Sequence, residues 1–171
     1  HGLPVLQPTD LKSLEFEVEL RKYDADLYVV VAYSILPKNI LAVTKFGAVN
    51  VHGSLLPKYR GAAPVQRAIA DGLQETGVTV FRLDEKMDHG PILAQRTVAI
   101  DHQDTTASLL DKMVAPGCDA LDDAINQLKN GCEKDLTQDH AQASGAPKIK
   151  KEEGLIDFNL PAQTIHNRIR A

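Results

Sequence analysis

Length, composition and charge limit the kinds of protein that this chain can be. It has 171 residues, of which 43% are hydrophobic, enough for one domain with a sizeable core and a short second piece. Trp is absent and aromatic residues make up 5%, so the core is expected to be aliphatic. A net charge of −4 argues against a protein whose main activity is nonspecific binding of nucleic acid, although it leaves room for a local basic patch.

Targeting signals and cysteines add two further expectations. No apolar run is long enough to span a membrane and no signal peptide is visible, so the cytoplasm is the expected compartment. The two cysteines, Cys118 and Cys132, form no CxxC pair, which argues against a structural zinc site. They are expected to be free and buried as small hydrophobic side chains.

Apolar patterns in the first quarter of the chain predict alternating helices and strands. Helices are expected over 11–23 and 37–43, and strands over 27–32 and 48–52. This order is typical of βαβ units in a parallel sheet. The run LYVVVA at 27–32 is continuous and rich in Val, as in a parallel strand that is buried on both faces.

The rest of the chain continues with predicted strands and one long helix. In order, we expect a helix over 65–70, strands over 78–83 and 92–100 that could pair as a hairpin, a long helix from Thr105 to Gly131, a short strand over 154–158 and a final helix over 161–171. Pro116 lies in the middle of the long helix and predicts a kink or a division into two helices. The polar, non-periodic segment 133–147 is expected to be a linker-like loop.

Polar residues alternate with valines in the strand at 48–52. This period of two puts Asn50 and His52 on one face at the end of the strand. A loop containing Pro and Gly follows, and α/β folds often place chemistry in such loops. From these residues alone, a functional site and a simple hydrogen-bonding cap of the strand end are equally good interpretations.

Asp88, in the turn between the two later strands, can approach His52 if both strand ends open on the same edge. A carboxylate beside an imidazole favours the charged ring and fixes its tautomer, which gives a proton carrier near neutral pH. The amide of Asn50 would supply a donor for an oxyanion. No Ser or Cys is placed as a nucleophile, so the three residues predict acyl-type transfer by direct attack of a substrate amine or of water.

Longer segments carry a resemblance that runs over nearly the whole chain: VNVHGSLLPKYRGAAPVQRAI, ETGVTVFRLDEKMDHGPIL and LIDFNLPAQTIHNRIRA. The string SLLPKYRGAAPVQ is highly specific among the formyl-group transferases that use 10-formyltetrahydrofolate. The chain therefore resembles the methionyl-tRNA formyltransferase family. The resemblance implies an α/β, Rossmann-like formyltransferase fold, with a mostly parallel central sheet that is flanked by helices and lacks its first strands.

The resemblance also implies a site, with Asn50, His52 and Asp88 as the catalytic set. The amine of the methionyl ester would attack the formyl carbon, Asn50 and protonated His52 would stabilise the formyl oxygen, and His52 would pass a proton to the folate N10. Arg60 would either contact tRNA or only fasten its own loop. The folate slot would be lined by Ser54, Leu55, Leu56, Pro57, Ile35, Leu36, Leu83, Asp84 and Met87. No metal is implied.

Two parts of the chain are distinguished by the resemblance. Residues 1–147 would be an N-terminally truncated catalytic core, and residues 148–171 a linker and the start of a helix leading to a missing C-terminal β-barrel. The partners would be 10-formyltetrahydrofolate and methionyl-initiator tRNA. Alternatives are a 10-formyltetrahydrofolate hydrolase, a formyltransferase with a sugar-amine or glycinamide acceptor, and a non-catalytic folate-binding remnant. Because a truncated sheet exposes its edges, these residues alone are expected to be unstable or to self-associate.

Overall fold

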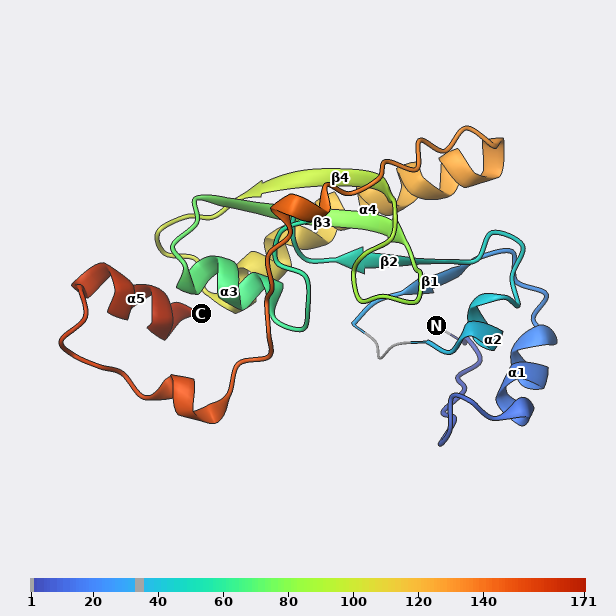
Figure 1. Cartoon of the computed structure of the whole chain (residues 1–171), viewed down its shortest axis with the longest axis horizontal. Coiled ribbons are helices and arrows are strands. Elements are labelled where there is room, and N and C mark those ends of the chain that lie inside the picture. Colours follow the sequence, from blue (N-terminus) through green and yellow to red (C-terminus); the bar gives the residue numbers. More distant parts are fainter. Residues whose placement is uncertain (1, 33–35) are drawn as a thin grey trace.

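The computed structural model describes residues 2–32 and 36–171, and Figure 1 shows how their helices and strands are arranged. In chain order these elements are α1 (Leu14–Arg21), β1 (Tyr28–Val30), α2 (Lys38–Leu41), β2 (Ala48–His52), α3 (Pro64–Ala70), β3 (Glu75–Arg82), β4 (Ile92–Ala99), α4 (Thr106–Asn130), the 3-10 helices η1 (His140–Gln142) and η2 (Lys151–Gly154), and α5 (Ala162–Arg170). The bounds of β2 are those predicted from its alternating residues.

The four strands form one mixed sheet in the order β1-β2-β3-β4. β1 runs parallel to β2, whereas β2 and β3 are antiparallel, as are β3 and β4. The α/β class is confirmed, but the prediction of a mostly parallel sheet is wrong for these four strands. β3 and β4 pair as the predicted hairpin, because the connection between them contains no crossover helix that could return the chain for a parallel pairing.

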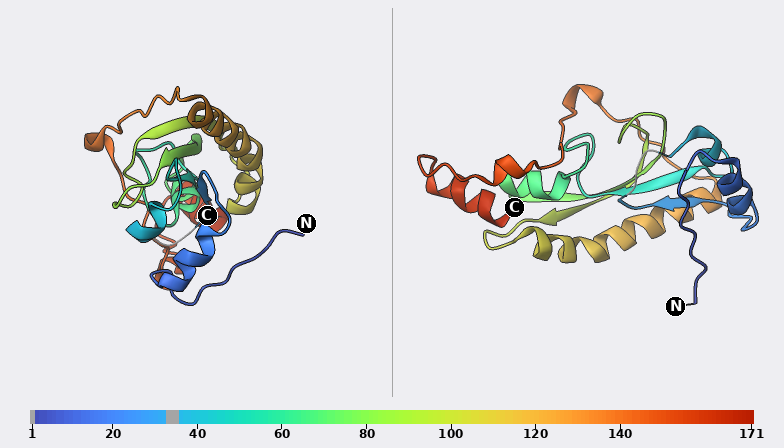
Figure 2. Two further views of the ribbon diagram at one scale, coloured as in Figure 1. Left: turned by 90° about the vertical axis from the view of Figure 1, so that its right-hand side faces the viewer. Right: turned by 90° about the horizontal axis from the view of Figure 1, so that it is seen from below.

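Helix α4 runs along one face of the sheet, as Figure 2 shows from two sides. It begins at a capping box between Thr105 and Ser108 and ends at Gly131, whose φ of +62° suits glycine. The core beneath its C-terminal half is aliphatic and contains Val49, Val80, Leu93, Ala120, Ala124 and Leu128. The helix is continuous through Pro116, so the predicted division into two helices is wrong.

Two burial predictions are also wrong. Val29 in β1 and Val31 just after it are 43% and 61% exposed, so this part of the chain is not covered on both faces in the structure formed by the described residues. Cys118 and Cys132 are free, as expected, but both are exposed. An apolar or small side chain in the sequence therefore did not guarantee a buried position in this molecule.

The segment 133–147 is more than a loose linker. Leu136 and Ile92 exchange two backbone hydrogen bonds of 2.8 and 2.9 Å, and Arg60 pairs with Gly145 in an isolated parallel bridge. The strand expected over 154–158 is absent, and the chain forms the 3-10 helix η2 just before it. α5 packs against α3. Within the described parts of the chain, no helix is long and apolar enough to cross a membrane.

Candidate active site

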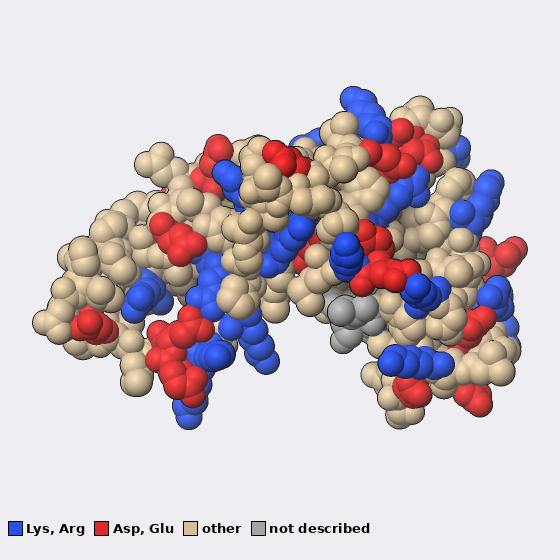
Figure 3. Space-filling model, viewed as in Figure 1, with Lys and Arg blue, Asp and Glu red and all other residues tan. Residues whose placement is uncertain are grey.

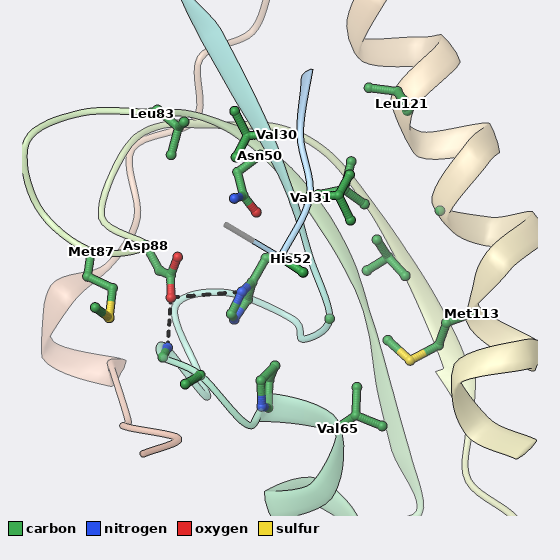
Figure 4. A pocket seen from close by; sticks show the side chains of 18 of the residues that line it. Val30, Val31, Asn50, His52, Val65, Leu83, Met87, Asp88, Met113 and Leu121 are labelled. Carbon is green, nitrogen blue, oxygen red and sulfur yellow. Dashed lines mark hydrogen bonds and ion pairs between the residues drawn. The ribbon is translucent and has the colours of Figure 1, made fainter. Parts of the chain in front are cut away.

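The end of β2 places two polar side chains at the mouth of a cavity. Val49 and Val51 pack into the core beneath α4, so the alternation of the strand turns Asn50 and His52 to the other face. Asn50, His52 and Asp88 all line one cavity, and Figure 4 shows their side chains gathered along the same side of it.

The His52 ring is held so that its two nitrogens face different partners. Nε2 lies 2.9 Å from the carbonyl oxygen of Tyr59, and a carbonyl can only accept, so Nε2 carries a hydrogen. In the neutral ring this leaves Nδ1 without a proton, and Nδ1 is the nitrogen that faces Asp88. The ring of Phe81 packs edge-on, with 6.4 Å between the ring centroids. The orientation of His52 is therefore fixed, with Nδ1 available for proton transfer.

Asp88 completes a pair with His52. Its Oδ2 lies 3.8 Å from His52 Nδ1, a separation that is too long for a hydrogen bond but suits an ion pair with the charged ring. The same oxygen accepts a 2.7 Å hydrogen bond from the backbone N–H of Gly61. The predicted approach of Asp88 to His52 is confirmed. Asp88 has a φ of +50°, in the left-handed region that Asp adopts more readily than most residues.

The cavity beside this pair has a volume of about 790 Å³, a size typical of sites for small molecules. Most of its walls are apolar side chains from β1, from the loop after β3 and from α4. They include Val30, Val31, Leu36, Leu83, Met87, Met113, Val114 and Leu121. In residues 2–32 and 36–171, no group of three or more His, Cys, Asp or Glu side chains is placed to hold a metal ion. The cavity thus combines polar groups at one side with walls suited to a flat, largely apolar ligand.

The Tyr59 carbonyl that orients His52 belongs to an anchored loop residue. The Tyr59 hydroxyl donates a 2.8 Å hydrogen bond to Asp71. Burial, together with this hydrogen bond, raises the pKa of Tyr59 to about 12, so the phenol stays protonated as a donor at neutral pH. The φ of Tyr59 is +58°, which only a well-supported non-glycine residue adopts.

Arg60 fastens the same loop to the segment that follows α4. Its Nε donates to Gln138 Oε1 at 3.2 Å, and its Nη2 to His140 Nδ1 at 2.9 Å. Burial and the positive charges nearby lower the pKa of His140, which favours the neutral ring that can accept this bond. The loop-fastening role expected for Arg60 is therefore observed, while a contact with tRNA stays a prediction.

Family comparisons agree with this arrangement. The model of the family described as formyl transferase matches residues 3–125, which is most of the chain. The chain belongs to the formyl transferase family. A second model, of the formyl transferase C-terminal domain, matches residues 148–171. The methionyl-tRNA formyltransferase of Desulfotalea psychrophila is 48% identical over 99% of this chain and 53% of its own length. The chain spans about half the length of the curated relatives it matches.

Two solved structures share the fold of this chain. HypX from Aquifex aeolicus, in complex with tetrahydrofolic acid, matches 91% of this chain and 27% of its own, with a TM-score of 0.79 at 20% identity. The N-formyltransferase from Helicobacter canadensis, in complex with folinic acid and dTDP-3-aminofucose, matches 80% of this chain and 51% of its own, with a TM-score of 0.70 at 26% identity. The predicted formyltransferase fold is therefore confirmed.

The structure brings only part of the expected folate slot to the cavity. Leu36, Leu83, Asp84 and Met87 line it together with the three polar residues, and Ile35 lies outside the described residues. The remaining four expected residues, Ser54, Leu55, Leu56 and Pro57, are not among its lining. Their contact with folate therefore stays a prediction.

These four residues do not line the cavity because the chain turns inward after Gly53. The Ser54 hydroxyl is buried and donates a 2.7 Å hydrogen bond to the Lys58 carbonyl. Leu56 is 3% exposed and packs with Phe81 and Ile92 in the core, so it does not line the cavity. These residues brace the loop that carries Tyr59 and Gly61 instead of lining the cavity.

Sequence reasoning missed the backbone groups and the buried amide that hold the pair. The Tyr59 carbonyl and the Gly61 N–H have no side-chain signature, although Gly61 stands in the RGAAP string already singled out. Gln138, which is 3% exposed, lies in a segment with no periodic pattern and gave no signal.

Proposed function

We propose that this chain carries the catalytic centre of a methionyl-tRNA formyltransferase, which transfers a formyl group from 10-formyltetrahydrofolate to the amino group of methionyl-initiator tRNA. The observation that carries the proposal is the meeting of Asn50, His52 and Asp88 beside a cavity of ligand size. The 48% identity to a methionyl-tRNA formyltransferase supports this choice of acceptor.

Each of the three side chains has a distinct part in this proposed reaction. The methionyl amine attacks the formyl carbon and forms the new C–N bond, the bond from that carbon to the folate N10 breaks, and N10 takes a proton. The Asn50 amide donates to the formyl oxygen as its negative charge grows. Nδ1 of charged His52 gives the proton to N10, while Nε2 stays on the Tyr59 carbonyl. Asp88 stabilises the charged ring. The attacking amine loses a proton as the new C–N bond forms, and this proton returns His52 to its charged form.

The apolar walls of the cavity suit the folate in this proposal. Leu36, Leu83 and Met87 stand on the side of the cavity where the chain leaves β1 and β3, and a flat ring system binds well between such side chains. The neighbouring Asp84 is kept in place by a 2.8 Å hydrogen bond between its Oδ2 and His89 Nδ1. Asp84 is one of the few polar groups available to orient the ring.

The charge distribution limits how this chain would grip a tRNA. Figure 3 shows acidic and basic side chains interspersed over the visible face rather than one continuous basic surface, and the net charge is −4. Broad attraction for phosphates requires clustered Lys and Arg. In this proposal the chain contacts methionyl-tRNA at its aminoacyl end, at the mouth of the cavity.

Formylation of methionyl-tRNA by the full-length protein, with 10-formyltetrahydrofolate, tests the proposal. His52→Ala is expected to lower kcat by about 100-fold or more, because a general acid contributes that much. His102→Ala, at an exposed histidine, is the matched control and is expected to keep the wild-type rate. Release of formate without transfer would show a hydrolase, and transfer only to a sugar amine or glycinamide another transferase. Turnover of none of these substrates by the wild type would show a non-catalytic protein.

A further inference from the structure

The chain after α4 supports both halves of the His52–Asp88 pair without lining the cavity. We call residues 136–146 the strap. It lies between the stretches that the two family models match, 3–125 and 148–171. The strap pairs with the start of β4 at one end, through Leu136 and Ile92, and with the loop after β2 at the other, through Gly145 and Arg60.

Gln138 connects the strap to Asp88. Its Nε2 donates to the backbone carbonyls of Asp88 and Gly90, at 3.0 and 2.7 Å, and its Oε1 accepts from Arg60. The side-chain amide is therefore fully used, and Gln138 is only 3% exposed. Because it bonds to carbonyls on both sides of the turn, it holds the left-handed backbone of Asp88 that aims the carboxylate at His52.

The other end of the strap holds the loop that supplies the two backbone contacts of the pair. The Ser144 hydroxyl accepts from the N–H of Tyr59 at 2.9 Å, and its carbonyl accepts from the N–H of Arg60 at 2.8 Å. The Arg60 carbonyl in turn accepts from the N–H of Ala146. These bonds fix the backbone on both sides of the Tyr59 carbonyl, which orients His52, and lead directly into Gly61, which binds Asp88.

We propose that the strap is the positioning element of the His52–Asp88 pair and that Gln138 is the positioning residue for Asp88. This inference rests on the proposed function. Gln138 touches no substrate and acts through the backbone of Asp88. A displacement of about 1 Å in a reacting geometry can cost about 100-fold in rate, so a residue outside the cavity can govern turnover.

Gln138→Glu tests this with a minimal change of shape. The new carboxylate can still accept from Arg60, but it has no hydrogens for the Asp88 and Gly90 carbonyls. In the full-length protein kcat for formylation of methionyl-tRNA is expected to fall about 10- to 100-fold. Gln142→Glu is the matched control: it makes the same change at an exposed position of the strap and is expected to stay within about twofold of wild type.

A double-mutant cycle separates positioning from a merely structural effect. If Gln138 acts through Asp88, adding Gln138→Glu to Asp88→Asn lowers kcat by less than about threefold, whereas independent effects multiply. The crystal structure of Gln138→Glu is expected to show Asp88 Oδ2 farther from His52 Nδ1 than 3.8 Å. A wild-type kcat for Gln138→Glu, full multiplication in the double variant or an unchanged Asp88 would each overturn the inference. A wild-type protein that formylates nothing would overturn the proposed function, while the crystal comparison would still decide the role of Gln138.

Discussion

Replacing Gly61 with Ala tests whether the backbone that binds Asp88 must be glycine. Gly61 has a φ of +123°, which side-chain-bearing residues rarely adopt, and an added Cβ would meet the Ala146 carbonyl oxygen at 2.7 Å. Since neither backbone segment is a flexible side-chain end, the loop or the strap must move. The strain is expected to cost about 1–3 kcal/mol of the free energy of unfolding. For a chain of this size, that lowers the melting temperature by about 2–12 °C.

The same movement withdraws a hydrogen bond from the proposed catalytic carboxylate. The Gly61 N–H would no longer lie 2.7 Å from Asp88 Oδ2, so Gly61→Ala is expected to lower kcat about 10- to 100-fold as well. Gly145→Ala is the control, because Gly145 lies in the bridge to Arg60 but an added Cβ meets nothing within 4 Å. Thermal melts and formylation rates of both variants would measure the effects. Equal melting temperatures and equal rates for the two variants would refute the reasoning.

Two further changes test packing and surface charge. Leu109→Ala, at a fully buried position of α4, is expected to lower the free energy of unfolding by about 2–5 kcal/mol in chemical denaturation. Leu110→Ala, at a position that is 47% exposed, should change it little, and similar losses for the two variants would contradict the burial seen in the structure. Hydrogen bonds from Arg67 and from the Lys150 backbone lower the pKa of Glu153 to about 2, from an ordinary value of 4.5. These contacts therefore stabilise the fold fully at pH values above the ordinary pKa of 4.5, and this stabilisation is lost as the pH falls through about 2. The difference in melting temperature between wild type and Glu153→Gln should shrink over this range, and a constant difference would count against the ion pair.

The parts predicted well were those whose signals are local. The strand at 48–52 was located to the residue, because polar residues alternate there with valines that pack into the core beneath α4. The long helix was delimited by its cap Thr105 and by Gly131, both of which have backbone requirements that depend on near neighbours. The approach of Asp88 to His52 was predicted, but the reason given for it was wrong. Because β2 and β3 are antiparallel, their carboxyl ends lie at opposite ends of the pair, and the loop after β3 brings Asp88 back to His52.

The predictions that failed required knowledge of partners. A run of valines is equally compatible with a covered strand and with an edge strand, and Val29 and Val31 turned out to be exposed. Alternation likewise carries no information about strand direction, so the antiparallel pairing of β2 with β3 could not be read from it. No local pattern indicates the contacts with Lys58, Phe81 and Ile92 that turn Ser54 and Leu56 inward, and the contact of these two residues with folate stays a prediction.

The strap shows why the residues of a site can be predicted from the sequence when the contacts that position them cannot. Asp88 was predictable because its carboxylate has an evident chemical use beside an imidazole, but the same carboxylate would be ineffective if its backbone relaxed from the left-handed region. That restraint comes from Gln138, which is 50 positions away in the sequence and looks like an ordinary polar loop residue. Each hydrogen bond of the strap is worth little in net stability. The strap therefore acts mainly through the geometry that it imposes on the His52–Asp88 pair. A change that weakens the strap is expected to lower kcat markedly while it lowers the free energy of unfolding only a little.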